Sequence, residues 1–311
     1  MIEIFLKTLP FFAIIGLGYL AGRRGFFSEE ATAYLTKFVF YFALSAMLFR
    51  FSANLTLADI FDKQFVFAYF AATLVVYLLA TFVALIRKRG VEEAAVEAQC
   101  AVIGNVGFLG IPMFVLLIGE AAIGPIMLVL AVDLIFFGSL IVILITGSRD
   151  GRMSLGIFRT VGTGLVKNPM IMSIVAGFIV SATQIPIPVP VNEFVTILGG
   201  AATPGALFAI GASLASKSAE RLEVAGWLSF CKLVVHPAAV AIAALFVFSV
   251  DPFAAGVMIA AAALPVAGNV YMIAQHYGVA PTRVSASILI STILSILTVS
   301  LVIGWVAKIA V

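Results

Sequence analysis

The hydrophobic residues of this chain fall into ten long segments, which short polar connections separate. A helix that crosses the hydrocarbon core of a bilayer needs about 20 mostly apolar residues, and each segment meets or approaches that length. The segments cover residues 4–21, 33–51, 65–86, 94–118, 123–146, 168–184, 193–215, 224–249, 253–276 and 284–307. The pattern predicts an all-α integral membrane protein with ten transmembrane helices.

The composition of the chain agrees with this pattern. Hydrophobic residues make up 63% of the sequence and charged residues only 11%, whereas about a quarter of the residues of a soluble domain are charged. No basic run with interleaved aromatic residues indicates nucleic acid binding. We therefore expect a multi-pass protein of a cell membrane, with the bacterial inner membrane as its location.

Two of the ten segments carry helix breakers at their centres. Residues 104–112 read Gly-Asn-Val-Gly-Phe-Leu-Gly-Ile-Pro, and residues 264–271 read Leu-Pro-Val-Ala-Gly-Asn-Val-Tyr. Unsatisfied backbone groups at membrane depth are costly, so an interruption there is tolerated only where protein or a water-filled cavity covers it. Each interruption therefore indicates a functional site at membrane depth.

The two interruptions also indicate an internal duplication. The tripeptide Gly-Asn-Val occurs at 104–106 and again at 268–270, about half a chain length later. Five segments per repeat bring the chain out on the opposite face, so the second repeat is inverted. We predict a first five-helix repeat at 1–150, a cytoplasmic linker at 151–167 and a second, inverted repeat at 168–311. Secondary transporters commonly combine inverted repeats with discontinuous helices.

The basic residues predict the orientation in the membrane. One face of the predicted topology receives most of the Lys and Arg residues: Arg23, Arg24, Arg87, Lys88, Arg89, Arg149, Arg152, Arg159, Lys167, Lys217, Arg221 and Arg283. The other face receives only Lys7, Arg50, Lys63 and Lys308. Cytoplasmic loops carry the excess of positive charge. The first face is therefore expected to be cytoplasmic, with both termini outside.

Asn105 and Asn269 are the leading candidates for substrate binding. A helix that restarts within the membrane exposes free N–H groups and a partial positive charge, which suit a carboxylate. An Asn at such a position adds amide donors without adding a charge. Gly104, Gly107 and Gly268 belong to the same predicted site. The structural alternative is that each Asn only satisfies the interrupted backbone beside it.

Other residues near the interruptions are assigned to supporting positions. Tyr271 follows the second Asn by two residues and is expected to extend the substrate site. Pro112 and Pro265 are expected to shape the interruptions without touching substrate. Glu97 and His276 lie near predicted cytoplasmic ends, so solvated positions are expected for both.

Three residues are candidates for coupling transport to an ion. Asp133 lies near the middle of segment 123–146, where a charge costs about 2.5 to 3.5 kcal/mol on insertion scales. The functional interpretation is a proton or cation relay, and the structural one is an ion pair with Lys232 or Lys37. Lys232 and His236 are four residues apart and share a helix face. This pair is suited to anion binding or proton exchange, unless Lys232 extends to the cytoplasmic surface.

Three motifs carry a resemblance to a known family: residues 105–112, 203–214 (Thr-Pro-Gly-Ala-Leu-Phe-Ala-Ile-Gly-Ala-Ser-Leu) and 264–271. In these motifs the chain resembles the auxin efflux carrier family, which includes plant PIN proteins and bacterial malonate-type permeases and belongs to the bile acid and arsenite transporter superfamily. The resemblance covers essentially the full length. It implies a scaffold domain, a transport domain and an elevator-type motion. It also implies that helices four and nine cross at their interruptions and hold the substrate carboxylate at Asn105 and Asn269. Family members usually have Pro at the position of Ser45.

The predicted function is secondary active transport of a small organic anion, either malonate-like or auxin-like. The alternative is a membrane channel or a ligand-binding sensor for the same class of anion. The chain has no catalytic motif and no P-loop, so neither an enzyme nor an ATP-driven pump is expected. Two His and two Cys in separate segments make a metal site unexpected, and no cofactor is predicted. H⁺ and Na⁺ both stay open as coupling ion, and a homodimer stays open as the assembly.

Overall fold

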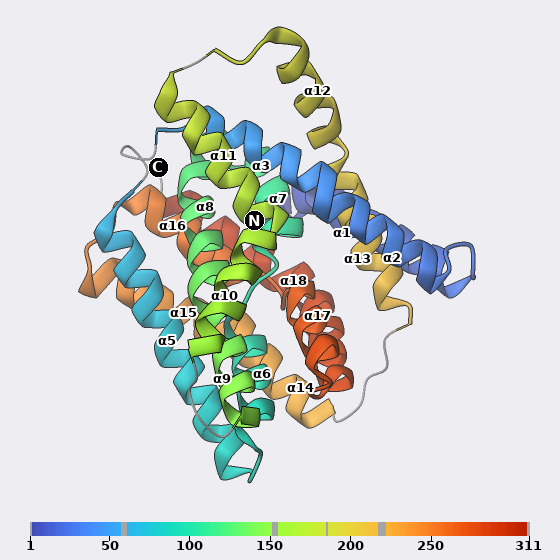
Figure 1. Cartoon of the computed structure of the whole chain (residues 1–311), viewed down its shortest axis with the longest axis vertical. Coiled ribbons are helices and arrows are strands. Elements are labelled where there is room, and N and C mark those ends of the chain that lie inside the picture. Colours follow the sequence, from blue (N-terminus) through green and yellow to red (C-terminus); the bar gives the residue numbers. More distant parts are fainter. Residues whose placement is uncertain (1, 57–60, 151–154, 185, 217–221, 310–311) are drawn as a thin grey trace.

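The computed structural model describes residues 2–56, 61–150, 155–184, 186–216 and 222–309. Within these ranges the chain is helical, apart from turns, short interruptions and one isolated pair of bridged residues (Figure 1). Of the predicted linker, positions 151–154 lie outside the description. So do Arg152, Lys217 and Arg221, which were counted in the prediction of orientation.

The first half of the chain contains five helical stretches, some of which include π-helical turns (η). In chain order the elements are α1 (Ile2–Arg23), α2 (Glu29–Phe38), η1 (Val39–Ala43), α3 (Leu44–Ala53), α5 (Lys63–Ile86), α6 (Val91–Val102), η2 (Val106–Gly110), α7 (Ile111–Leu117), the 3₁₀ turn η3 (Glu120–Ala122), α8 (Ile123–Ala131), η4 (Val132–Phe137) and α9 (Gly138–Asp150). Each stretch coincides with one of the first five predicted segments.

The second half adds one helix that the sequence analysis did not anticipate. Its elements are α10 (Leu155–Lys167), α11 (Pro169–Thr183), α12 (Val189–Gly200), α13 (Ala202–Leu214), α14 (Leu222–Phe230), η5 (Cys231–Val235), α15 (His236–Ile242), η6 (Ala243–Val247), α16 (Pro252–Ala262), α17 (Gly268–Tyr277) and α18 (Pro281–Ile309). The unexpected helix is α10, which forms from most of the predicted linker.

Many of these helices are long and apolar enough to cross a membrane. Among the described residues six qualify: Glu29–Ala53, Lys63–Ile86, Glu120–Arg149, Val189–Leu214, Leu222–Val247 and Pro281–Val306. A seventh is obtained if Arg159–Lys167 and Pro169–Thr183, bent by 70°, are counted as one span. Shorter apolar helices occupy Thr8–Arg23, Val106–Leu117 and Pro252–Ala262. The prediction of an all-helical, multi-pass membrane protein is confirmed.

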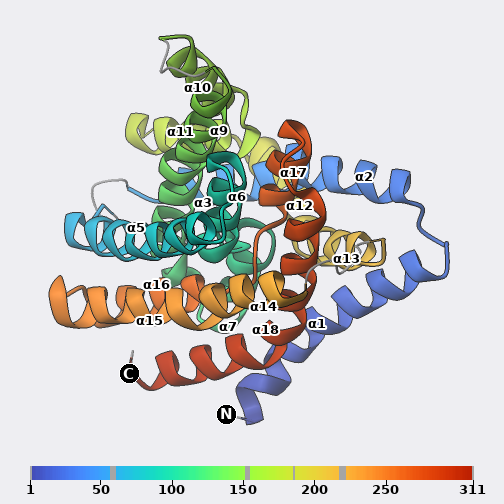
Figure 2. The ribbon, with the colours of Figure 1, turned by 90° about the horizontal axis from the view of Figure 1, so that it is seen from below.

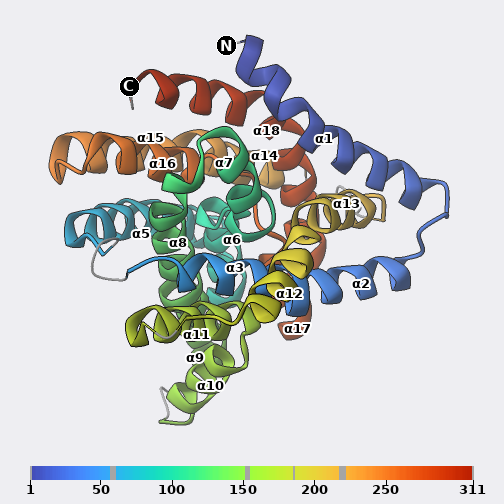
Figure 3. The same cartoon turned by 90° about the horizontal axis from the view of Figure 1, so that it is seen from above.

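The helices form two groups by packing. In the α1 group, α1 lies along α13, α3 packs between α11 and α12, and α2 contacts α13. In the α5 group, α5 packs on α6 and α15, and α18 contacts α14, α16 and α17. Figures 2 and 3 show α1, α2 and α13 together on one side of the molecule and α5 and α15 on the other. The groups meet where η2 contacts α13 and where α1 contacts α7 and α18.

The close contact between α1 and α13 depends on glycine. A Cβ atom added at Gly211 would lie only 1.9 Å from the carbonyl oxygen of Ile15. Small residues that let helix backbones approach closely are typical of membrane helix interfaces. This contact makes the α1 group a tightly packed unit.

The two segments with helix breakers are interrupted at the predicted places. Residues 103–105 separate α6 from η2, and residues 263–267 separate α16 from α17. An isolated antiparallel bridge between Gly104 and Val266 joins the two interruptions. All residues from Ala94 to Val102 and from Ala255 to Ala262 are buried. The interrupted helices therefore lie at the centre of the α5 group, where protein covers them.

Candidate functional site

The two interruptions satisfy each other's backbone hydrogen bonds. The N–H of Asn105 donates to the carbonyl oxygen of Pro265 over 2.8 Å, and the N–H of Ala267 donates to the carbonyl oxygen of Ile103 over 3.1 Å. Unpaired backbone groups away from water carry a large free-energy cost, and these bonds remove it for both segments at once. The fourth and ninth predicted segments thus meet at their interruptions, and we call this place the crossing.

A cavity of about 580 Å³ lies beside this crossing. Five of the six residues predicted to bind substrate line it, namely Gly104, Asn105, Gly107, Gly268 and Asn269. Asn105 is 7% exposed and Asn269 is half-buried. The structure therefore brings both Asn residues of the repeated tripeptide to one space.

Buried polar atoms without partners surround the cavity. Among the described side chains, Oδ1 of Asn269, Oε1 of Gln99 and Oδ2 of Asp133 are buried and accept no hydrogen bond. All three residues line the cavity. A buried polar atom left unsatisfied costs about 1 to 3 kcal/mol, so three around one space indicate a site for water or a polar ligand. Gln99 was missed in the sequence, where an uncharged polar residue two positions after Glu97 gave no separate signal.

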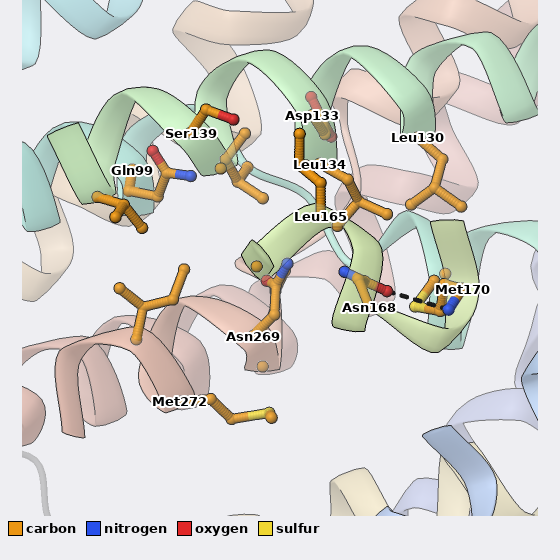
Figure 4. A pocket seen from close by; sticks show the side chains of 18 of the residues that line it. Gln99, Leu130, Asp133, Leu134, Ser139, Leu165, Asn168, Met170, Asn269 and Met272 are labelled. Carbon is orange, nitrogen blue, oxygen red and sulfur yellow. Dashed lines mark hydrogen bonds between the residues drawn. The ribbon is translucent and has the colours of Figure 1, made fainter. Parts of the chain in front are cut away.

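The corner between α10 and α11 forms another wall of the cavity. Asn168 caps α11, since its Oδ1 accepts the N–H of Met170 over 3.0 Å. Figure 4 shows its amide nitrogen on the side that faces Asn269. Thr160, Lys167 and Asn168 all line the cavity. An Asn directly before a Pro is a capping signal for a helix start, and the predicted segment 168–184 begins at this residue.

Tyr271 and the two prolines lie outside the described lining of the cavity. Tyr271 is half-buried and packs against the hydrophobic core, while its neighbours Met272 and Ile273 line the cavity instead. Pro112 is buried at the start of α7, and Pro265 lies within the second interruption. These positions agree with a shaping role for the prolines, and Tyr271 is not among the described residues that line the cavity.

Asp133 is buried in the π-helical turn η4 and also lines the cavity. Its Oδ1 accepts a hydrogen bond from the hydroxyl of Tyr69 over 2.8 Å. In the described part of the chain no Lys nitrogen lies within 4.0 Å of its carboxylate. Among the described residues the structure therefore shows no direct contact of the kind that the structural alternative, a pair with Lys232 or Lys37, would make.

Lys232 and His236 are fully buried, and the end of the Lys232 side chain reaches the crossing. The ammonium of Lys232 donates to the carbonyl oxygen of Ala262, the last residue of α16, and lies 3.2 Å from Nδ1 of His236. Nε2 of His236 lies 3.0 Å from the hydroxyl of Thr73 on α5. The shared helix face is confirmed, and the extension of Lys232 to the cytoplasmic surface is wrong.

Comparison with known proteins identifies the family of this chain. The model of a family described as "Membrane transport protein" matches residues 3–303. The chain belongs to this family, the auxin efflux carrier family.

Two relatives match this chain along almost their whole length. A protein of Rhizobium meliloti (strain 1021) named "Putative malonate transporter" is 31% identical over 307 residues, which cover 96% of this chain and 95% of the relative. A protein of Escherichia coli (strain K12) named "Uncharacterized transporter YfdV" is 26% identical over 307 residues, with 94% of each chain covered. The aligned stretches therefore span the part of the chain that contains both interruptions.

One cluster of charged side chains is buried where the sequence analysis expected a solvated position. Glu97 is fully buried and not solvated. Its carboxylate pairs with Arg87 from the end of α5 and with Arg283 from the start of α18, the latter at 2.6 Å. His276 is exposed, as predicted, and lies at the cavity wall. The cluster connects three helices of the α5 group, α5, α6 and α18.

Proposed function

We propose that this protein is a secondary active transporter of a small organic anion, a carboxylate of the malonate type, which binds at the crossing of the two interrupted helices. The observation that carries the proposal is the cavity at the crossing, with the amide groups of Asn105 and Asn269 and the start of helix α17 in its wall. The family membership supports a transporter over an enzyme.

The start of α17 supports an anion at this position. The helix begins at Gly268, and its N-cap residue, Ala267, has no side chain that could accept a bond from the first N–H groups. Both residues line the cavity. Free N–H groups and the positive end of a helix dipole attract anions. The amide groups of Asn105 and Asn269 add neutral hydrogen-bond donors beside these N–H groups.

The size of the cavity and the named relative support a small substrate. Pockets for small molecules span about 300 to 1,000 Å³, and this cavity of about 580 Å³ lies within that range. One relative carries the name of a malonate transporter. A short carboxylate with two to four carbons is accordingly the first substrate class to test.

The position of the cavity supports an elevator-type mechanism. Phe40 and Met170 line it from the α1 group, whereas Gln99 and Asn269 line it from the α5 group. A substrate bound there touches both groups. In the proposed mechanism the α1 group is the scaffold, and the α5 group carries the anion across the membrane. Each of the two inverted five-helix repeats contributes helices to both groups. The predicted orientation places both termini outside the bacterial inner membrane.

We also propose that Asp133 takes part in proton or cation movement. Its unpartnered Oδ2 lines the same cavity as the proposed anion site. Tyr69 holds the other carboxylate oxygen. The buried pair of Lys232 and His236 lies behind the crossing and is the second candidate for coupling.

Uptake into proteoliposomes tests the proposed function. The purified protein should accumulate radiolabelled malonate or a related carboxylate against its gradient, with saturation at high concentration. Liposomes without protein are the control. Flux that only follows the gradient and does not saturate would indicate the channel alternative. Binding in a thermal-shift screen of carboxylates without any flux would indicate a sensor.

A further inference from the structure

Lys232 is a buried basic residue beside the crossing, and no carboxylate among the described residues lies next to it. Its side chain is fully buried in the membrane-spanning stretch Leu222–Val247. Among the described residues, no carboxylate oxygen lies within 4.0 Å of its ammonium. Asp133 attracts it electrostatically from a longer distance. A buried charge within a membrane is costly and is usually tied to function.

The partner of this ammonium is the end of an interrupted helix. Ala262 is the last residue of α16, and its carbonyl oxygen accepts a hydrogen bond from Lys232. The carbonyl end of a helix carries a partial negative charge. In transporters with interrupted helices, such carbonyl ends coordinate the coupling cation. The ammonium of Lys232 therefore occupies the kind of position that Na⁺ takes in other carriers.

The ammonium lies directly behind the crossing. A Cβ atom added at Gly104 would be 3.2 Å from Cε of Lys232 and 3.3 Å from its Nζ. Gly104 faces the cavity, whereas Lys232 is not among the described residues that line it. Only the thickness of one backbone segment thus separates the ammonium from the proposed anion site.

His236 fixes the position of the ammonium, and Thr73 in turn fixes the position of the His236 ring. An ammonium group only donates hydrogen bonds, so Nδ1 of His236 accepts the bond from Lys232. In the neutral imidazole, Nε2 then carries the proton and donates to the hydroxyl of Thr73. The chain of contacts from α5 through α15 to α16 orients a single positive charge at the crossing.

We propose that Lys232 is a tethered cation that takes the place of an inorganic coupling cation at the crossing. The inference rests on the proposed function, because it concerns transport of an anion through the same crossing. The fixed charge stabilises the carbonyl end of α16 and attracts the anion in front of it. Transport therefore needs no added Na⁺.

Replacement of ions around the intact protein tests this inference first. Carboxylate uptake by wild-type proteoliposomes is measured in media with Na⁺, K⁺ or choline as the cation. The expected rates are the same in all three. Uptake that stops without Na⁺ would overturn the inference and leave the proposed transport function intact. Absence of uptake in every medium would overturn both.

Two variants then distinguish the effect of the Lys232 charge from the effect of the volume of its side chain. Lys232→Met keeps most of the volume and removes the charge, so uptake should fall about tenfold or more in every medium. Lys232→Ala leaves a space beside the Ala262 carbonyl, so Na⁺ or methylammonium should restore uptake that is lost in choline. Lys37→Ala is the control, since Lys37 is an exposed lysine of α2, and its uptake should be unchanged.

The outcomes distinguish a tethered cation from a purely structural lysine. Rescue of Lys232→Ala by Na⁺ or methylammonium supports the inference, because a structural role would not respond to small cations. Folded Lys232→Ala without rescue, or Lys232→Met with wild-type uptake, overturns it. Thermal unfolding in detergent checks that each variant is folded. If Lys232→Met does not fold, the alanine variant and the ion replacement decide.

Discussion

The backbone N–H of Asn105 donates to the carbonyl oxygen of Pro265, so the interruption in one half of the chain is completed by the interruption in the other. Within the described residues, neither Asn105 nor Asn269 uses its side chain to cap the helix that follows. The interpretation that each Asn only satisfies the broken backbone beside it therefore has no support. Both amides remain available to a ligand.

Replacement of either amide should abolish transport without loss of folded protein. We expect Asn105→Ala and Asn269→Ala to lower carboxylate uptake about tenfold or more, because each removes hydrogen bonds to a charged ligand worth about 1.5 to 3 kcal/mol. Uptake into proteoliposomes measures the loss, and size-exclusion chromatography measures the folded fraction. Asn192→Ala is the control, since Asn192 is exposed on α12. Normal uptake in both site variants would remove the assignment of the site.

A methyl group at Gly104 should disturb the crossing. The added Cβ would lie 3.2 Å from the carbonyl oxygen of Ala261 and equally close to Cε of Lys232. We expect Gly104→Ala to destabilise the protein by about 1 to 3 kcal/mol, the usual range for overpacking, and to slow uptake. Thermal unfolding in detergent measures the first effect.

The matched control for this variant is Gly226→Ala. Gly226 lies within α14, and an added Cβ would have no neighbour within 4 Å. Alanine favours a helix over glycine, so this variant should be as stable as the wild type or slightly more stable. Equal stability of the two alanine variants would contradict the tight contact at Gly104.

Removal of the buried carboxylate of Glu97 should have a large effect on stability. Glu97→Ala leaves the charge of Arg283, which is itself largely buried, without its closest partner. Loss of one partner of a buried ion pair destabilises proteins by about 3 to 5 kcal/mol. Denaturation in detergent measures the change.

Arg89→Ala is the control for the Glu97 variant, because it removes an ion pair at the surface instead of a buried one. Arg89 pairs with Glu93 at 3.8 Å, and both side chains are about one-third exposed. Pairs at the surface contribute about 0 to 1 kcal/mol. A similar loss of stability in both variants would show that burial does not distinguish the two ion pairs.

Substitution of Asp133 should change how uptake depends on ion gradients. Asp133→Asn keeps the size of the side chain and removes its charge, so a carrier that moves a proton or cation through this carboxylate should lose the response to that gradient. Tyr69→Phe, which removes only the bond to Oδ1, should retain the response. Uptake is measured with imposed pH and Na⁺ gradients. An unchanged gradient dependence in Asp133→Asn would exclude the role in coupling.

The sequence predicted the interruptions because Gly, Asn and Pro stand in apolar segments where an ordinary helix has none. It did not predict the direction of Lys232, because both faces of segment 224–249 are apolar and periodicity cannot tell the inner face from the outer. Glu97 was expected to be solvated because its position near a helix end was visible. Its partner Arg283 belongs to a helix nearly 200 positions away, and no local pattern reports such a contact.

The wall formed by α10 and α11 was missed for a different reason. The polar and basic residues of 151–167 suggested a connection outside the membrane, and that composition does not reveal a helix that folds back over a cavity. Asn168 carried a capping signal, but its link to the substrate site depends on tertiary structure. The site was therefore predictable where two copies of one tripeptide pointed to it, and not where a single residue contributed.

The bridge between Gly104 and Val266 has a consequence for how such carriers diversify. Main-chain atoms join the two interruptions, so most side chains around the cavity can be exchanged while the crossing persists. Substitutions of the side chains can therefore change which substrate the cavity accepts without breaking the backbone contact that joins the two interruptions. A relative that shares only 26% of its residues with this chain can therefore keep the same framework while the side chains around the cavity change.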